Sequence, residues 1–141
     1  MCHLFIDTSG SMSEMGKDSG TVYIAKSIQD YCNFNNIEIK LHKFDGEIIN
    51  TLHSLSFSND VSFKSLRSLI EDNQYVSSLV LTDGLMEEDI TIDAAVIAIG
   101  IDADHFNLSK IFKKVYEVEN VISAIEYIIN DDTMTRVVDA E

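Results

Sequence analysis

Two short apolar runs, Ser78–Thr82 and Ala94–Ile101, constrain the fold of this chain more than any other feature of its sequence. Each run is almost continuous in apolar residues, which is typical of a strand buried on both faces of a parallel sheet. Segments with helical spacing of apolar residues precede and follow the two runs. This alternation predicts an α/β fold in which helices cover both faces of a mostly parallel sheet.

The remaining elements follow from apolar periodicity and turn residues. Asp45-Gly46 is a strong hairpin signal, so a strand at about Glu47–Leu52 is expected to run antiparallel to the strand before it. Asp18 or Ser19 is expected to cap the first helix. The other predicted strands are Cys2–Asp7, Ile37–Phe44 and about Val115–Val118. Four helices are predicted: the first ends near Phe34, and the second carries Phe63, Leu66, Leu69 and Ile70. The third spans about Phe106–Lys113, and the fourth spans about Asn120–Asn130.

Length and charge limit the possible partners. A chain of 141 residues fits one domain, predicted over residues 1–130, with residues 131–141 as a frayed tail. The net charge of −14 disfavours nucleic acid and anionic membranes. Met1 leads directly into a strand without a basic leader region, so we expect a cytoplasmic protein. Cys2 and Cys32 form no CxxC pair and are expected in the core, as in a reducing compartment.

Two predicted strands end in loops rich in carboxylates and hydroxyls. Asp7-Thr8-Ser9-Gly10-Ser11 follows the first strand, and Asp83-Gly84 follows Ser78–Thr82. Parallel strands present their carboxyl ends at one edge of the sheet, where ligands bind if the strand order reverses. If these two strands are neighbours, Asp7, Ser9, Ser11 and Asp83 converge. Their hard oxygen atoms suit Mg²⁺, and Mn²⁺ or Ca²⁺ remain open alternatives.

These motifs resemble those of a known family. Phe5-Ile6-Asp7-Thr8-Ser9-Gly10-Ser11-Met12 resembles the Asp-x-Ser-x-Ser element of the metal-ion-dependent adhesion site (MIDAS) of von Willebrand factor A-type (vWA) domains, in its common bacterial form. Leu81-Thr82-Asp83-Gly84 resembles the element with the later Asp, and Ile97-Ala98-Ile99-Gly100-Ile101 resembles the fifth strand. The resemblance implies a Rossmann-like, doubly wound sheet of six strands in order 3-2-1-4-5-6, with strand 3 antiparallel. It also implies that Ser9 and Ser11 bind the metal directly, and Asp7 and Asp83 largely through water.

One loop departs from the family pattern. The family usually places a Thr before its third helix, and the best match here, Asn59-Asp60-Val61-Ser62-Phe63, has Val61 at that position. A valine side chain cannot ligate Mg²⁺. Asp60, Ser62 or Ser58 is the candidate replacement after a local shift; the alternative is a vWA fold that has lost its metal.

The resemblance implies an adaptor rather than an enzyme. A partner protein would complete the metal site with an acidic side chain, assisted by Asp60 and the Glu87–Asp89 rim. Small bacterial vWA proteins often act alongside MoxR-type AAA+ ATPases, or with kinases and phosphatases of conflict and tellurium-resistance clusters. A metal-free scaffold is the first alternative. The second is a phosphatase of the haloacid dehalogenase type with Asp7 as nucleophile and Thr82 as phosphate-binding hydroxyl, although Ser9 replaces the second Asp that this family needs.

Overall fold

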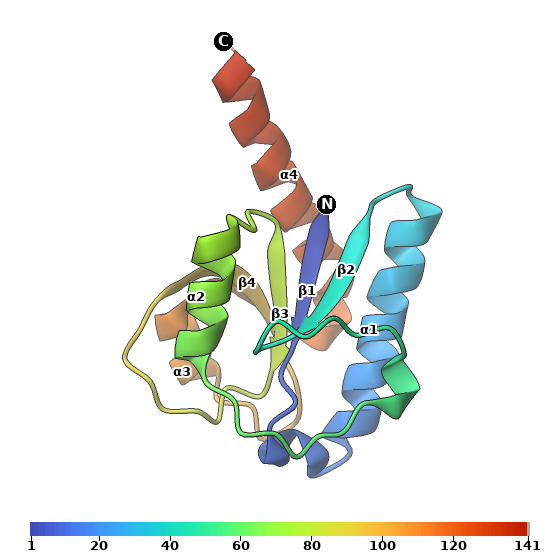
Figure 1. Ribbon diagram of the computed structural model, residues 1–141, viewed down its shortest axis with the longest axis vertical. Helices are drawn as coiled ribbons and strands as arrows, with labels where there is room; N and C mark the ends of the chain where they lie inside the picture. The colour runs from blue at the N-terminus through green and yellow to red at the C-terminus, as the bar shows by residue number, and fades with distance from the viewer. Residues whose placement is uncertain (141) are drawn as a thin grey trace.

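The chain folds into a five-stranded parallel sheet with helices on both faces (Figure 1). The computed structural model describes the backbone of residues 1–140 and the side chains of residues 1–130. The strands are β1 (Cys2–Ile6), β2 (Ile39–Lys43), β3 (Ser78–Thr82), β4 (Ile92–Ala98) and β5 (Phe112–Tyr116). The helices are α1 (Lys17–Phe34), α2 (Phe63–Asn73), α3 (His105–Ile111) and α4 (Val121–Ala140). The predicted α/β class is confirmed.

The strand order β2-β1-β3-β4-β5 places β1 beside β3 at the point where the order reverses. Every pair of neighbouring strands in this sheet is parallel, and the β1–β3 register joins Leu4 to Leu79 and Ile6 to Leu81. The carboxyl ends of the strands therefore meet at one edge, which lies at the bottom of Figure 1, and the first loop turns there. This edge is where ligands bind in open α/β sheets.

Each face of the sheet has its own apolar core. Alternating strand residues face opposite sides, so Leu4 and Ile6 join one core and Phe5 joins the other. The first core contains residues of α1 and α4, and the second contains residues of α2 and α3. Figure 1 shows α2 and α3 on the side of the sheet opposite α1. Strands buried on both sides explain why β1 and β3 are continuously apolar.

The predicted antiparallel third strand is wrong, and the sheet has five strands rather than six. The Asp45-Gly46 turn does form, with Gly46 at φ +97°, and the chain returns far enough for one antiparallel bridge between His42 and Ile48. Pairing stops there because Ile49 and Leu52 turn into the core beside α1. A short 3-10 helix, η2 (Leu52–Ser54), then takes the place of the strand's end. The order of the other five strands agrees with the prediction.

Three helix ends also differ from expectation, and one of them is that of α3, which ends at Ile111 instead of Lys113 because β5 begins at Phe112. The cap of α1 is Gly16 in the left-handed conformation, rather than Asp18 or Ser19, and Lys17 is the first helical residue. At the other end of the chain, α4 continues past residue 130. The side chains of residues 131–140 and the whole of residue 141 lie outside the described part, so the expected frayed tail stays a prediction. Within the described residues, no helix has the length and apolar character needed to span a bilayer.

A pair of buried histidines packs beneath α2. His3 Nδ1 and His42 Nε2 are 3.1 Å apart, so one ring nitrogen donates a hydrogen bond and the other accepts it. The His3 ring stacks on Tyr75 with 3.9 Å between centroids, and the His42 ring stacks on Phe5 at 4.8 Å. Burial and the neighbouring His42 lower the pKa of His3 from 6.5 to about 4. Burial also lowers the pKa of His42. Both rings are therefore neutral near pH 7.

Acidification is expected to destabilise the fold through this pair. The unfolded chain binds a proton at His3 more tightly than the folded chain does, so stability is lost as the pH falls from 6.5 towards 4. That difference in pKa corresponds to on the order of 3 kcal/mol. Urea unfolding of the wild-type chain and His3→Gln across this range should give a shallower pH dependence for the variant. The exposed His53→Gln is the control, and equal slopes for all three proteins would contradict the assignment.

Candidate metal-binding site

Asp7 organises the end of β1. Its backbone N–H donates to the Leu81 carbonyl at 3.0 Å, which continues the β1–β3 ladder by one residue. Its carboxylate Oδ1 accepts from the Ser9 N–H at 2.9 Å, and its Oδ2 accepts from the Thr82 hydroxyl at 2.6 Å. The side chain is fully buried, and burial raises its pKa although the Thr82 and Ser9 hydrogen bonds oppose that rise. Asp7 therefore positions the loop rather than facing solvent.

The loop after Asp7 turns around a buried methionine. Met12 is fully buried in the α1/α4 core and anchors the short 3-10 helix η1 (Gly10–Ser13). The Met12 N–H donates to the Ser9 carbonyl at 3.1 Å, which closes the turn. This tight turn brings the hydroxyls of Ser9 and Ser11 to the same side, 3.3 Å apart. Both serines are half-buried, so their hydroxyls lie at the surface of the edge.

The second loop completes the cluster. Asp83 is fully buried, and its Oδ2 accepts from the Ser11 hydroxyl at 2.8 Å. Its Oδ1 accepts from the Leu85 N–H at 3.1 Å, which holds the carboxylate in one orientation. The structure thus brings Asp7, Ser9, Ser11 and Asp83 together, as the sequence predicts. We call these four residues the edge cluster.

The oxygen atoms of the edge cluster fit a small hard cation. Ligand oxygens about 2.1 Å from Mg²⁺ in an octahedron lie about 3 Å from their nearest neighbours. The Ser9–Ser11 distance of 3.3 Å and the Ser11–Asp83 distance of 2.8 Å bracket that spacing. Among the side chains that the structure describes, no three His, Cys, Asp or Glu residues gather to hold a metal. The donor set therefore depends on the hydroxyls and suits Mg²⁺ better than Zn²⁺.

Lys17 contacts the edge cluster through Asp83 and also pairs with Asp102, and neither Lys17 nor Asp102 is predicted from the sequence. The Lys17 ammonium donates to Asp83 Oδ2 and to Asp102 Oδ2, both at 2.9 Å. Burial lowers the pKa of Lys17, but the hydrogen bonds and charges of Asp102 and Asp83 more than offset this and raise it. Lysine is almost never fully buried unless it is paired, so a sequence pattern does not reveal such a residue. Asp102 lies in the turn that follows β4, and this position after a strand end is the signal that could have pointed to it.

The loop before α2 lies beside the cluster but contributes differently from expectation. Asn59 forms a bridge with Ser9 and donates its N–H to the Thr8 carbonyl at 3.0 Å. Val61 packs on the α2/α3 core, which explains an apolar residue there. The Ser62 hydroxyl accepts from the Ser65 N–H and caps α2, and Asp60 is exposed. The structure thus shows no hydrogen bond between Asp60 or Ser62 and the edge cluster.

Contacts from two helices brace the loop that follows Asp83. The side-chain amide of Asn107, near the start of α3, donates to the carbonyls of Gly84 and Met86, both at 2.8 Å. Gly84 has φ +72°, and a Cβ there would lie 2.7 Å from Leu108 Cγ. Further along, the Glu88 carboxylate accepts from the first N–H groups of α2. Part of the predicted acidic rim is therefore a helix cap.

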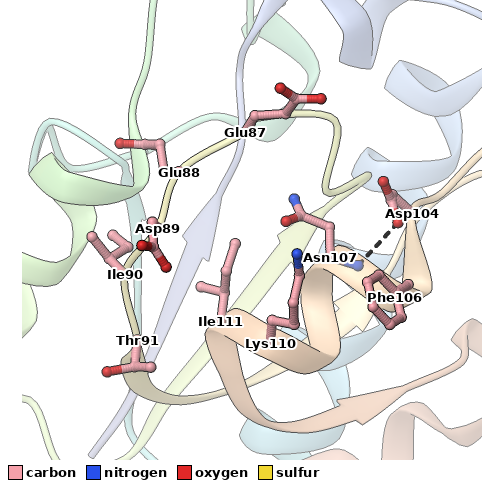
Figure 2. A pocket seen from close by; sticks show the side chains of 10 residues that line it. All are labelled: Glu87, Glu88, Asp89, Ile90, Thr91, Asp104, Phe106, Asn107, Lys110 and Ile111. Carbon is pink, nitrogen blue, oxygen red and sulfur yellow. Dashed lines mark hydrogen bonds between the residues drawn. The ribbon is translucent and has the colours of Figure 1, made fainter.

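One cavity, between the loop after Asp83 and α3, is separate from the edge cluster. It has a volume of about 480 Å³ (Figure 2). Figure 2 shows Glu87, Glu88 and Asp89 on one side and Phe106, Asn107 and Lys110 on the other, with Asn107 bonded to Asp104. None of the four residues of the edge cluster lines this cavity. We therefore place the candidate site at the edge cluster, where the hydroxyl and carboxylate oxygens gather, and not in this cavity.

Gly100 tests whether Lys17 is held in place by its surroundings. Gly100 has φ +97°, and an added Cβ would lie 2.5 Å from Lys17 Cδ and 3.0 Å from Asp102 Oδ1. Gly100→Ala should displace Lys17 and cost about 2–4 kcal/mol of unfolding free energy in urea titrations. Gly20→Ala in α1 is the matched control, because a Cβ there meets nothing within 4 Å. That control should be neutral or stabilising by up to about 1 kcal/mol. Equal changes in unfolding free energy for the two variants would show that the surroundings of Lys17 do not hold its side chain in place.

Comparisons with known proteins leave the family of this chain open. A scan against protein-family models finds no match, and a search of curated proteins finds no significant match.

Proposed function

We propose that this chain is a vWA-type interaction module, which binds another protein through a divalent cation, Mg²⁺ or a similar ion, at the edge cluster. The observation that carries the proposal is the run of three oxygens from Ser9, Ser11 and Asp83 at the β1–β3 switch point. By the vWA resemblance, Ser9 and Ser11 would supply direct ligands and Asp7 and Asp83 would act largely through water. Because only a few ligands would come from this chain, the ion would keep a coordination position for a carboxylate of the partner.

A small apolar hollow, lined in part by the Lys17 side chain that contacts Asp83, supports a protein partner. It has about 210 Å³, and its lining includes Met15, Tyr23 and Val118. Met15 and Tyr23 are exposed, and the nearby Ile101 is 90% exposed. Exposed apolar side chains next to polar anchors are typical of protein interfaces. A partner would place an acidic residue at the cluster and an apolar residue in this hollow.

The surroundings of Asp7 favour binding over catalysis. A carboxylate nucleophile needs a lone pair facing the substrate. Asp7 is fully buried, and both of its oxygens already accept hydrogen bonds from Thr82 and Ser9. Under the phosphatase alternative, Asp7→Asn would abolish Mg²⁺-dependent turnover of simple phosphate esters. We expect no such turnover in the wild-type chain.

Cation binding should depend on the two hydroxyls. We expect saturable one-site binding of Mn²⁺ and Mg²⁺ to the EDTA-treated chain in calorimetric titrations. Ser9→Ala/Ser11→Ala should weaken it at least tenfold, because it removes the direct oxygen donors. Ser13→Ala is the matched control, since its hydroxyl bonds only to the Gly10 carbonyl in the same loop. If the double variant binds as tightly as the wild-type chain, the cation lies elsewhere.

Partner binding distinguishes this function from the metal-free alternative, which Val61 and the buried ammonium of Lys17 favour. Candidate partners by the vWA resemblance are a MoxR-type AAA+ ATPase, or a kinase or phosphatase of a conflict or tellurium-resistance cluster. Binding to such a purified partner should be lost in EDTA and restored by Mg²⁺, and it should be absent in Ser9→Ala/Ser11→Ala. Partner binding that survives EDTA at full strength would establish the metal-free scaffold.

A further inference from the structure

Lys17 places a buried positive charge in contact with the edge cluster. Its side chain is 1% exposed, and the Asp83 side chain it contacts is equally buried. The oxygen that accepts from Lys17, Asp83 Oδ2, is the same atom that accepts from the Ser11 hydroxyl. The ammonium is therefore in direct contact with the last of the three oxygens in the Ser9–Ser11–Asp83 row.

The position of this ammonium is built into the fold. Lys17 begins α1, and its N–H donates to the Glu14 carbonyl at 3.0 Å, so the helix start holds its backbone. Its stem runs against Gly100, where any Cβ would collide with it. Asp102 accepts from the ammonium through Oδ2, while its buried Oδ1 has no hydrogen-bond partner. The ammonium cannot move away from Asp83 unless the start of α1, Gly100 or Asp102 also moves.

The contact differs from the ordinary lysine–aspartate pair on the same helix. Lys26 and Asp30 form an ion pair at 3.0 Å with side chains that are 63% and 62% exposed. Solvent screens an exposed pair of this kind, so its charges scarcely affect their neighbours. Buried charges are screened much less and act strongly on any ion close by. Lys17 therefore affects a cation at the edge cluster in a way that Lys26 does not.

We propose that Lys17 is a resident cation of the edge cluster that competes with a divalent ion for Asp83 and keeps the intrinsic affinity of the site low. This inference rests on the proposed cation-binding function. With Lys17 in place, the positive charge partly neutralises Asp83 and Asp102, so less negative charge is left to attract an ion. A carboxylate brought by a partner would add the missing charge. Stable occupation of the site would then require the partner.

The test is calorimetric titration of Mn²⁺ into matched variants of the full chain. Lys17→Met and Lys17→Gln remove the charge, and each should bind Mn²⁺ at least tenfold more tightly than the wild-type chain. Lys17→Arg keeps the charge and should bind as weakly as the wild-type chain. Lys26→Met removes an exposed charge from the same helix and should leave the affinity unchanged. Circular dichroism shows which variants fold, and Lys17→Gln retains a hydrogen-bond donor if Lys17→Met does not fold.

The outcomes separate this inference from the proposed function. Ser9→Ala/Ser11→Ala in the Lys17→Gln background should abolish the added affinity. If the wild-type chain binds Mn²⁺ through Ser9 and Ser11 but neutral variants of Lys17 bind no better, the inference is wrong and the function stands. If only the neutral variants bind, the inference holds and the cation function of the unpartnered chain fails. If no variant binds, both fail.

Discussion

The parallel pairing of β1 with β3 determines where every polar side chain of the edge cluster lies. The register joins Ile6 to Leu81, and one further hydrogen bond from the Asp7 N–H extends it to the strand ends. Two hydrogen bonds then follow from that alignment: Thr82 reaches Asp7, and Ser11 reaches Asp83. A shift of two residues would keep the same faces buried but move the two aspartates apart by roughly 7 Å. The exact β1–β3 register, and not the burial of the two faces alone, therefore fixes the polar geometry at the edge.

The polar groups of the edge cluster divide into those that hold the loop and those whose hydroxyls lie near the surface. Asp7 has both oxygens committed to the fold, whereas Ser9 and Ser11 bond mainly with each other and with Asp83. Asp7 and the buried Met12 therefore hold the loop in its conformation. In the proposed cation-binding function, the two serines are the residues that would exchange a hydrogen bond for the metal while Asp7 and Met12 keep the turn. Buried polar groups of the first kind are costly to disturb, and half-buried groups of the second kind are not.

The strands β1 and β3 and the four edge residues were predictable because their signals are local, whereas β5 begins at Phe112, inside the helix predicted to reach Lys113. β3 runs from Ser78 to Thr82 as predicted, and the residues after it and after β1 follow by position alone. The third strand failed because its end turns into the core: Ile49 and Leu52 pack beneath α1, which alternation does not reveal. Lys17 and Asp102 were missed for a related reason, since 85 residues separate them and only the tertiary fold places them in contact. The position of a residue at a strand end predicts which loops meet at the sheet edge, but it does not predict an ion pair between a helix start and a distant loop such as Lys17–Asp102.

The Glu88 cap of α2 links two parts of the molecule that open separately in most proteins. The side chain of an N-cap residue usually accepts a hydrogen bond from an N–H group in the first turn of its helix, and Ser62 accepts from the Ser65 N–H in this way. The N–H groups of Phe63 and Lys64 are satisfied by Glu88, from the loop that begins at Asp83. Detachment of that loop would leave the first turn of α2 with unpaired donors. These two hydrogen bonds therefore couple local opening of the loop to fraying of the first turn of α2.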